Sequence, residues 1–125
     1  MPTLFDPVTA GDLHLANRIV MAPLTRNRSP DAIPGPLAAA YYTQRATAGL
    51  IITEATTITQ QGQGYFDVPG LYGTEQLDGW KQVTRRVREA GVWRQQQCCV
   101  LRCLHAAVQL EVQAGWWAGG LLMLG

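Results

Sequence analysis

The sequence predicts an α/β protein with a parallel sheet, and three observations point to this class. Two short apolar runs, residues 18–22 and 50–53, have the composition of strands that are buried on both faces. A segment with helical spacing lies between these runs, and a second such segment follows them. Strands and helices in this order give parallel pairing through right-handed crossovers. Because two parallel strands cannot form a sheet covered on both faces, the pattern predicts the beginning of an α/β fold.

The segment before the first strand, residues 4–17, predicts a β-hairpin or a capping loop. A turn-rich quartet at residues 9–12 separates two apolar stretches there, and the second stretch alternates apolar and polar residues. The first strand is expected at about residues 18–22. Pro23 has no N–H to donate, so regular pairing should end there, and Thr25 should supply a hydroxyl at the carboxyl end of the strand.

The first helix is expected to begin at Pro36, where a missing N–H costs nothing, and to end at Gly49. The residues with helical spacing are Leu37, Ala40, Tyr41, Gln44 and Ala48. The second strand starts at once, over residues 50–53 or slightly beyond. The loop at residues 58–72 is long for a connection, and such loops are usually functional or disordered.

The second helix is predicted to open with Thr74 as its N-cap and Glu75 in its first turn, and to end at Gly91. Its apolar stripe comprises Leu77, Trp80, Val83, Thr84 and Val87. Its basic residues are Lys81, Arg85, Arg86 and Arg88. We interpret these basic residues as a solvated face that favours the helix dipole, and not as a binding patch.

The bulk composition argues against several classes of protein. The 125 residues suffice for one small domain with a core, and a net charge of +1 argues against nucleic acid or an anionic membrane as a partner. No run reaches the roughly 18 apolar residues of a membrane span, and the start of the chain does not resemble a signal peptide. The three cysteines do not form a secreted disulfide framework. We therefore expect a soluble protein of the reducing cytoplasm.

The composition changes abruptly after Gly91, which divides the chain into residues 1–91 and residues 92–125. The second part holds all three cysteines and three of the four tryptophans. Its candidate metal ligands are Cys98, Cys99, Cys103 and His105. Their spacing is not that of a zinc site, so we expect no metal. Residues 100–110 could form a short apolar helix. Most residues of this part have codons rich in G and C, which suggests a shifted reading frame or a retained intron.

Four stretches of the chain carry a recognisable pattern: LFDPVTAGDLHLANRIVMAPLTRNRS, AYYTQRATAGLIITEATTIT, GQGYFDVPGLYG and the helix ending RRVREAG. Together they resemble the amino-terminal part of the Old Yellow Enzyme family, almost continuously over residues 2–91. The resemblance implies a flavin-dependent ene-reductase on a (β/α)8 barrel, of which this chain has an incomplete, amino-terminal part. The implied reaction passes hydride from NAD(P)H through FMN to a small-molecule substrate, an activated alkene.

The resemblance also implies roles for particular residues. The segment that the family lays against FMN, at the carboxyl end of the first barrel strand, corresponds to Ala22, Pro23, Leu24 and Thr25. The Thr25 hydroxyl would stabilise charge gained on reduction and so tune the potential of the cofactor. Ala55 matches a small residue beside the flavin, and Tyr65 matches an aromatic residue on the substrate side. Without the resemblance, these residues would be read as a turn cap, a core alanine and a packing or surface tyrosine.

Departures from the family pattern limit what the chain can do alone. The family's substrate-binding histidine pair (or histidine and asparagine), its proton-donating tyrosine and its flavin-binding arginines lie later in the family's sequence, and none is present here. The chain has about half of the roughly 250 residues of a barrel. We therefore assign no catalytic residue, interpret Glu54 as a structural carboxylate, and expect weak or no FMN binding and no turnover. The alternative is a truncated, non-catalytic isoform that binds a partner protein.

Overall fold

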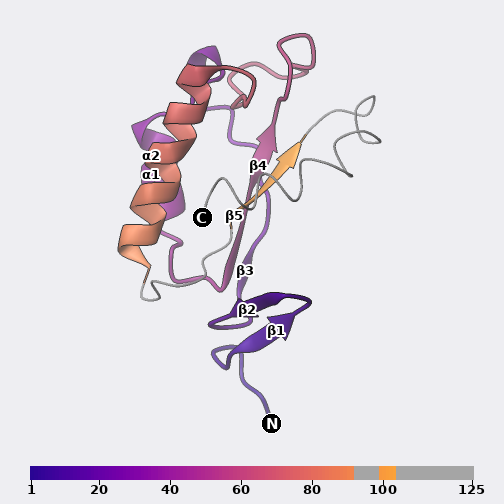
Figure 1. Cartoon of the computed structure of the whole chain (residues 1–125), viewed down its shortest axis with the longest axis vertical. Coiled ribbons are helices and arrows are strands. Elements are labelled where there is room, and N and C mark those ends of the chain that lie inside the picture. Colours follow the sequence, from indigo (N-terminus) through magenta and orange to yellow (C-terminus); the bar gives the residue numbers. More distant parts are fainter. Residues whose placement is uncertain (92–98, 104–125) are drawn as a thin grey trace.

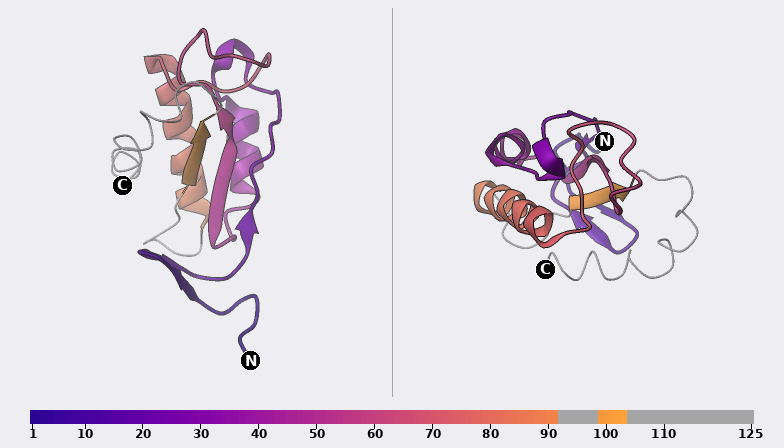
Figure 2. Two further views of the ribbon diagram at one scale, coloured as in Figure 1. Left: turned by 90° about the vertical axis from the view of Figure 1, so that its right-hand side faces the viewer. Right: turned by 90° about the horizontal axis from the view of Figure 1, so that it is seen from above.

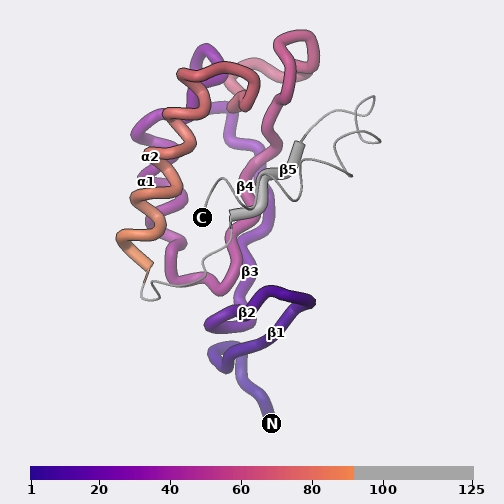
Figure 3. The backbone as a smooth tube through the Cα atoms, viewed as in Figure 1, coloured from indigo at the N-terminus to yellow at the C-terminus, as the bar shows by residue number. Residues whose placement is uncertain are grey.

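The computed structural model describes residues 1–91 and 99–103, which form a two-stranded sheet, a three-stranded sheet and two α-helices (Figure 1). The elements in chain order are β1 (Val8–Ala10), β2 (Leu13–Leu15), β3 (Val20–Met21), the 3-10 helix η1 (Pro30–Ala32), α1 (Pro36–Thr43), β4 (Leu50–Thr56), α2 (Thr74–Ala90) and β5 (Cys99–Cys103). Strands β1 and β2 pair in antiparallel fashion. This hairpin lies beyond the amino end of the larger sheet, away from the helices (Figure 3).

The larger sheet is parallel and has the strand order β3-β4-β5. Val20 pairs with Leu50, and Ile51 pairs with Cys99. Helices α1 and α2 lie side by side on one face of this sheet (Figure 2). The helix suggested for residues 100–110 is wrong for residues 100–103, because these belong to β5, where β4 supplies backbone partners. Residues 104–110 lie outside the described part of the chain.

Strand β3 is shorter than the sequence predicts, and strand β4 continues past residues 50–53. Strand β3 is confined to Val20–Met21 within the expected 18–22, because a side chain holds the backbone just before it. The Oδ1 atom of Asn17 accepts hydrogen bonds from the N–H groups of Ile19 (3.0 Å) and Gly49 (2.8 Å). Strand β4 continues past residue 53, as the sequence allowed, and reaches Thr56.

Helix α1 buries a different face from the one with the expected spacing. Ala38, Ala39 and Tyr42 are buried, whereas Leu37 of the expected stripe is 69% exposed. Helical spacing exists on both faces because most residues of this helix are apolar, so the pattern predicts a helix without choosing its buried side. The helix also ends before Gly49, and the chain reaches β4 through tighter turns.

Helix α2 has Gly73 as its N-cap, so the prediction of Thr74 at this position is wrong. The N–H groups of Tyr72 and Gly73 donate to Oε1 of Gln76 (3.0 and 2.9 Å). A side chain from the first turn therefore folds back over the helix start and makes a threonine cap unnecessary. In the predicted stripe, Trp80, Val83 and Val87 are buried, and Leu77 and Thr84 are half-buried. The basic residues Lys81, Arg85, Arg86 and Arg88 are exposed, as expected of a solvated face.

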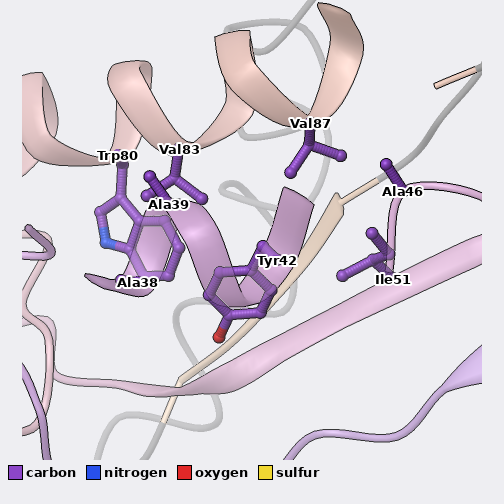
Figure 4. Packing of buried hydrophobic residues seen from close by; sticks show 8 residues of the cluster. All are labelled: Ala38, Ala39, Tyr42, Ala46, Ile51, Trp80, Val83 and Val87. Carbon is purple, nitrogen blue, oxygen red and sulfur yellow. The ribbon is translucent and has the colours of Figure 1, made fainter. Parts of the chain in front are cut away.

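The core lies between α1, α2 and β4 (Figure 4). Its buried members are Ala38, Ala39, Tyr42, Ala46, Ile51, Trp80, Val83 and Val87. The rings of Tyr42 and Trp80 have their centroids 6.1 Å apart. The Nε1–H of Trp80 donates to the carbonyl oxygen of Gly70 (3.1 Å), so the core also holds the loop that follows β4.

The start of α1 and the middle of α2 approach closely at Gly79. A Cβ atom at this position would lie 2.6 Å from the carbonyl oxygen of Pro34, which leads into α1. Non-bonded carbon and oxygen atoms do not come so close, so the crossing depends on the absence of a side chain. Glycine inside a helix ordinarily costs about 1 kcal/mol relative to alanine. Close packing of the two elements therefore outweighs helix propensity here.

We expect Gly79→Ala to lower the free energy of unfolding by about 1–3 kcal/mol, because the added methyl group forces the two elements apart. The sign is informative, since helix propensity alone would make the variant more stable. Urea unfolding followed by circular dichroism measures the change. Gly64→Ala is the matched control, because a Cβ atom there meets nothing within 4 Å. Equal loss in both variants would contradict the role of the crossing.

Candidate functional site

The chain segments that follow β3 and β4 are joined to each other at the carboxyl edge of the sheet. The N–H of Ser29 donates to the carbonyl oxygen of Asp67 (2.9 Å), and the N–H of Gly70 donates to that of Ala32 (2.7 Å). Ligands of parallel α/β sheets bind beyond the carboxyl ends of the strands. These joined loops are therefore the part of the fold where a functional site is expected.

The predicted cofactor-binding residues lie next to one hydrogen bond at this edge. The N–H of Arg26 donates to Oε2 of Glu54 (3.0 Å). Because Arg26 follows Thr25 and Glu54 precedes Ala55, this bond brings the two predicted segments side by side. Ala55 is 7% exposed. Of the other predicted residues, Ala22, Leu24 and Thr25 are exposed and Pro23 is half-buried.

Tyr65, the predicted substrate residue, lies in the loop between β4 and α2 and is 59% exposed. Within the described part of the chain, its ring and hydroxyl make no hydrogen bond or ring contact. The loop itself is anchored close by, because the neighbouring Asp67 accepts the bond from Ser29. The structure therefore holds Tyr65 on the same edge as Thr25 and Ala55 without bringing their side chains into contact.

Left-handed backbone is concentrated in these same two loops. Four non-glycine residues in the ranges 1–91 and 99–103 have positive φ: Asn27 (52°), Asp31 (56°), Ala32 (60°) and Asp67 (54°). Ala32 is the least expected, because alanine has no polar side chain to stabilise this conformation. Such a conformation costs on the order of 1 kcal/mol or more, and it persists only where surrounding contacts impose it. Here Ala32 is 1% exposed, and its carbonyl oxygen is held by Gly70.

Glu54 connects helix α1, strand β4 and the segment after β3. Besides accepting from Arg26, its Oε1 atom accepts from the hydroxyl of Tyr42 (3.3 Å). The same hydroxyl accepts from the N–H of Glu54 (2.9 Å). Glu54 is 3% exposed, and all of these partners are internal. The interpretation of Glu54 as a structural carboxylate agrees with this network.

Burial raises the pKa of both acids in the network. For Glu54, loss of solvation raises the pKa above 4.5, while the N–H of Arg26, the Tyr42 hydroxyl and the charge of Arg26 oppose the rise. For Tyr42, loss of solvation raises the pKa well above its ordinary range. The hydrogen bond with the backbone of Glu54 opposes this rise in pKa, and the Glu54 carboxyl group adds to it. Tyr42 therefore remains a hydroxyl donor at neutral pH.

A further feature of this edge was not foreseen from the sequence. The Cζ atoms of Arg26 and Arg45 lie 4.3 Å and 4.0 Å from the ring centroid of Tyr41. A hollow of about 220 Å³ opens beside them, lined by Arg26, Arg28, Ser29, Leu37, Ala38, Ala40, Tyr41, Gln44 and Glu54. The Tyr41–Arg45 contact has helical i,i+4 spacing and could have been recognised. The Arg26 contact joins distant parts of the sequence, so no local pattern indicates it.

Other site types find no support among the described residues. No group of three or more His, Cys, Asp or Glu side chains there could hold a metal ion. The cysteine-rich segment lies outside the side chains that the structure describes. In the ranges 1–91 and 99–103, no helix is long and apolar enough to cross a membrane.

A parallel α/β sheet with helices on one face and joined loops at its carboxyl edge is the framework of a ligand-binding α/β enzyme. Comparison of the sequence with known families shows which family within this class the chain matches. Residues 3–110 match the NADH:flavin oxidoreductase / NADH oxidase family, and the chain belongs to that family. The matched range extends beyond Gly91, into the part that the composition sets apart.

Two curated relatives show what fraction of a relative's length the chain covers. It is 47% identical over 89 residues to 12-oxophytodienoate reductase 1 of rice (Oryza sativa subsp. japonica), covering 70% of this chain and 23% of the relative. It is 47% identical over 94 residues to chanoclavine-I aldehyde reductase of Penicillium roqueforti, covering 73% of this chain and 26% of the relative. The chain therefore spans about a quarter of the length of these relatives.

Solved structures give the same assignment. Morphinone reductase in complex with tetrahydroNAD superposes with a TM-score of 0.76 at 46% identity, covering 84% of this chain and 28% of that one. The Old Yellow Enzyme homologue from Zymomonas mobilis superposes with a TM-score of 0.74 at 43% identity, covering 83% and 28%. The predicted Old Yellow Enzyme relationship is confirmed, and FMN with a nicotinamide reductant is the cofactor pair of this family.

We expect Glu54→Gln to remove a pH dependence of stability. Because the folded-state pKa of Glu54 is raised, its contribution to the free energy of unfolding is complete below pH 4.5 and is lost as the pH rises through the raised pKa. The difference in stability between parent and Glu54→Gln should therefore fall with pH across this window. Urea unfolding at a series of pH values measures it.

Tyr42→Phe is the informative control for this titration. It keeps the carboxyl group and removes a hydroxyl that lowers the pKa of Glu54. The pH window should therefore extend upward in Tyr42→Phe, whereas it disappears in Glu54→Gln. A parent-minus-Glu54→Gln difference that rises with pH would show that burial does not dominate the pKa of Glu54.

Proposed function

We propose that this chain is the amino-terminal, FMN-contacting part of a cytoplasmic ene-reductase. When bound, FMN supplies reversible two-electron chemistry, by which hydride from NAD(P)H reaches an activated alkene. The observation that carries the proposal is the bond from Arg26 to Glu54, because it sets the segment of Thr25 beside that of Ala55. Family membership and relatives named as reductases of 12-oxophytodienoate and chanoclavine-I aldehyde support the same chemistry.

The residues at this edge suit a flat, polar-edged ring such as a flavin. Thr25 is exposed, and its hydroxyl makes no hydrogen bond to the residues that the structure describes. It is therefore available to donate to the ring edge. The backbone of Ala22, Pro23 and Leu24 would line one side of the ring, and the small side chain of Ala55 would permit close approach. Tyr65 would face the substrate.

The isolated chain is proposed to lack catalysis. It spans about a quarter of the relatives it matches. The resemblance implies that the family's substrate-binding and proton-donating side chains come from later parts of the family's sequence. The site residues it carries would supply cofactor contacts alone. Substrate activation in the whole enzyme would depend on other barrel units.

The purified 125-residue chain should therefore carry no flavin and should not oxidise NAD(P)H in the presence of an activated enone. A chimera in which residues 1–91 replace the matching segment of morphinone reductase should bind FMN, because the remaining units complete the site. Absorbance of the purified proteins at flavin wavelengths tests both statements. A folded chimera without FMN would overturn the proposed cofactor role, and flavin bound to the isolated chain would contradict its dependence on the other units.

In that chimera, Thr25→Val should lower the reduction potential of the flavin. A hydroxyl that stabilises charge gained on reduction contributes about 1 kcal/mol, and about 30 mV of a two-electron couple equals 1.4 kcal/mol, so we expect a shift of about 20 mV. Potentiometric titration followed by absorbance measures it. Thr25→Ser keeps the hydroxyl and should stay near the parent value. Equal potentials in the valine and serine variants would leave Thr25 without the proposed role.

We further propose that the abrupt change after Gly91 reflects a shifted reading frame or a retained intron. The composition of residues 92–125 supports this, whereas the family match to residue 110 and the pairing of β5 with β4 indicate that part of the segment suits the fold. Sequencing the transcript and the genomic DNA across the codons of Gly91 and Val92 decides the question. Codons for family-like residues that resume in another frame or beyond a removable segment would support the proposal, and their absence would contradict it.

A second candidate function is a non-catalytic protein that binds a partner. Among the described strands, β3 is paired on one edge only, and this favours the candidate because exposed strand edges readily pair with other chains. Capture of a full-length family enzyme by the tagged chain would support this candidate. Capture of chaperones alone would argue against it.

A further inference from the structure

The segment that carries the candidate cofactor contacts, residues 22–25, leaves the sheet at its start. The ladder between β3 and β4 ends with Met21. Two residues later a proline, which has no N–H, prevents the ladder from continuing. After Met21, the first hydrogen bond to β4 among the described residues is the one from the N–H of Arg26 to Oε2 of Glu54 (3.0 Å). The position of Thr25 relative to β4 therefore depends on the side chain of Glu54.

Tyr42 fixes the direction of that side chain. The Tyr42 hydroxyl accepts from the N–H of Glu54 (2.9 Å) and donates to Oε1 of the same residue (3.3 Å). Figure 4 shows the Tyr42 ring within the core, with its hydroxyl directed toward β4. One hydroxyl thus binds both the backbone and the carboxyl group of Glu54, and Oε2 is left to accept from Arg26. Glu54 is buried, so water does not compete for this oxygen.

Two further contacts hold the loop after β3, but each constrains Thr25 less directly. The Cζ atom of Arg26 lies 4.3 Å from the ring centroid of Tyr41, and this contact is made by the flexible end of a long side chain. The N–H of Ser29 donates to a carbonyl oxygen of the loop after β4 (2.9 Å), farther along the chain. The bond to Glu54 is therefore the backbone contact nearest to Thr25.

We propose that Glu54 is a positioning residue for the flavin-binding edge and that it influences the reduction potential of the flavin through the Thr25 hydroxyl. By binding the Arg26 N–H, it keeps the backbone of Thr25 in one place beside Ala55. A hydroxyl donates effectively only within about 3 Å of its acceptor and in good alignment, so a backbone that moves weakens the bond. The inference rests on the proposed cofactor role of Thr25 and gives Glu54 a function beyond structural support.

Two substitutions separate positioning from a direct effect of charge. A nearby carboxylate disfavours the negative charge gained on reduction, so removal of its charge would raise the potential. Glu54→Gln removes the charge but keeps an oxygen that can accept from the Arg26 N–H. Glu54→Met has a similar size and removes both the charge and the acceptor. A difference between these two variants therefore reports positioning, because neither of them carries the charge.

The first measurement uses the full 125-residue chain without flavin. Amide hydrogen exchange followed by NMR reports how firmly the Arg26 N–H is bonded. After correction for the global stability of each variant, we expect this N–H to exchange about tenfold or more faster in Glu54→Met than in the parent, and near the parent rate in Glu54→Gln. Equal rates in the parent and Glu54→Met would overturn the proposal.

Asn17→Ala is the matched control for both measurements. The Asn17 side chain also bridges the segments of β3 and β4, but it does so at the amino end of the sheet. Its loss should lower the free energy of unfolding and leave the corrected exchange of the Arg26 N–H and the flavin potential unchanged. A potential that follows stability alone would shift in Asn17→Ala as well, which would contradict a positioning role for Glu54.

The second measurement is potentiometric titration of the FMN-bound chimera of residues 1–91 with morphinone reductase. We expect a lower flavin potential in Glu54→Met than in Glu54→Gln, by no more than the shift caused by Thr25→Val. In the Thr25→Val background this difference should vanish, because Glu54 acts through the hydroxyl that is absent there. If Glu54→Met does not fold by circular dichroism, Tyr42→Phe takes its place, since it removes the hydroxyl that directs Oε2 of Glu54.

The outcomes distinguish this inference from the proposed function. A folded chimera without FMN would overturn the proposed function and the inference with it. A bound flavin with equal potentials in Glu54→Met and Glu54→Gln would overturn the inference alone. A difference that persists in the Thr25→Val background would do the same, because Glu54 would then act by a route other than Thr25.

Discussion

The burial of one carboxylate is the constraint on which the arrangement of this chain depends. Glu54 is removed from water at the end of β4, and an unpaired carboxylate there would be strongly unfavourable. Its partners come from two other elements: the hydroxyl of Tyr42 on α1 and the N–H of Arg26 after β3. Helix packing and the course of the edge loop therefore satisfy a single requirement. A shift of either element would remove one of the two groups that donate hydrogen bonds to Glu54.

Two adjacent tyrosines lie on different faces of α1, one on the buried face and one on the outer face. Tyr42 points into the core, against Trp80, and its hydroxyl reaches Glu54. Tyr41, with its ring centroid 5.2 Å from that of Tyr42, carries the guanidinium groups of Arg26 and Arg45. Arg26 belongs to both arrangements, through its backbone on one side and its side chain on the other. The edge loop is thus held on one side by the hydrogen bond from the Arg26 N–H to Glu54 and on the other by the stacking of the Arg26 side chain on Tyr41.

The secondary-structure elements that local sequence patterns determine were predicted. The features that depend on contacts between distant residues were not. Apolar runs and glycine or proline boundaries predicted β3, α1, β4 and α2, because these patterns act within a few residues. The buried face of α1 was not predictable, since its two faces are similarly apolar and only the position of Trp80 and Ile51 distinguishes them. The cap of α2 was missed because the Gln76 side chain folds back. For the site, the resemblance supplied Thr25, Ala55 and Tyr65, whereas the stacking of Arg26 on Tyr41 appears only once distant segments are folded together.

At the amino end of the sheet, an amide side chain and not a carboxylate connects the strands. Asn17 bonds the N–H groups of Ile19 and Gly49, and its Nδ2 donates to the carbonyl oxygen of Thr47 (2.8 Å). One amide side chain thus sets the register of β3 and β4 without any contribution from the loops at the far edge. The side chain that holds β3 and β4 together therefore lies at one end of the strands, and the candidate ligand contacts lie at the other. A loop at the carboxyl edge can therefore be exchanged for that of a relative, provided that the hydrogen bond from Arg26 to Glu54 is kept, while Asn17 holds the other end of the strands.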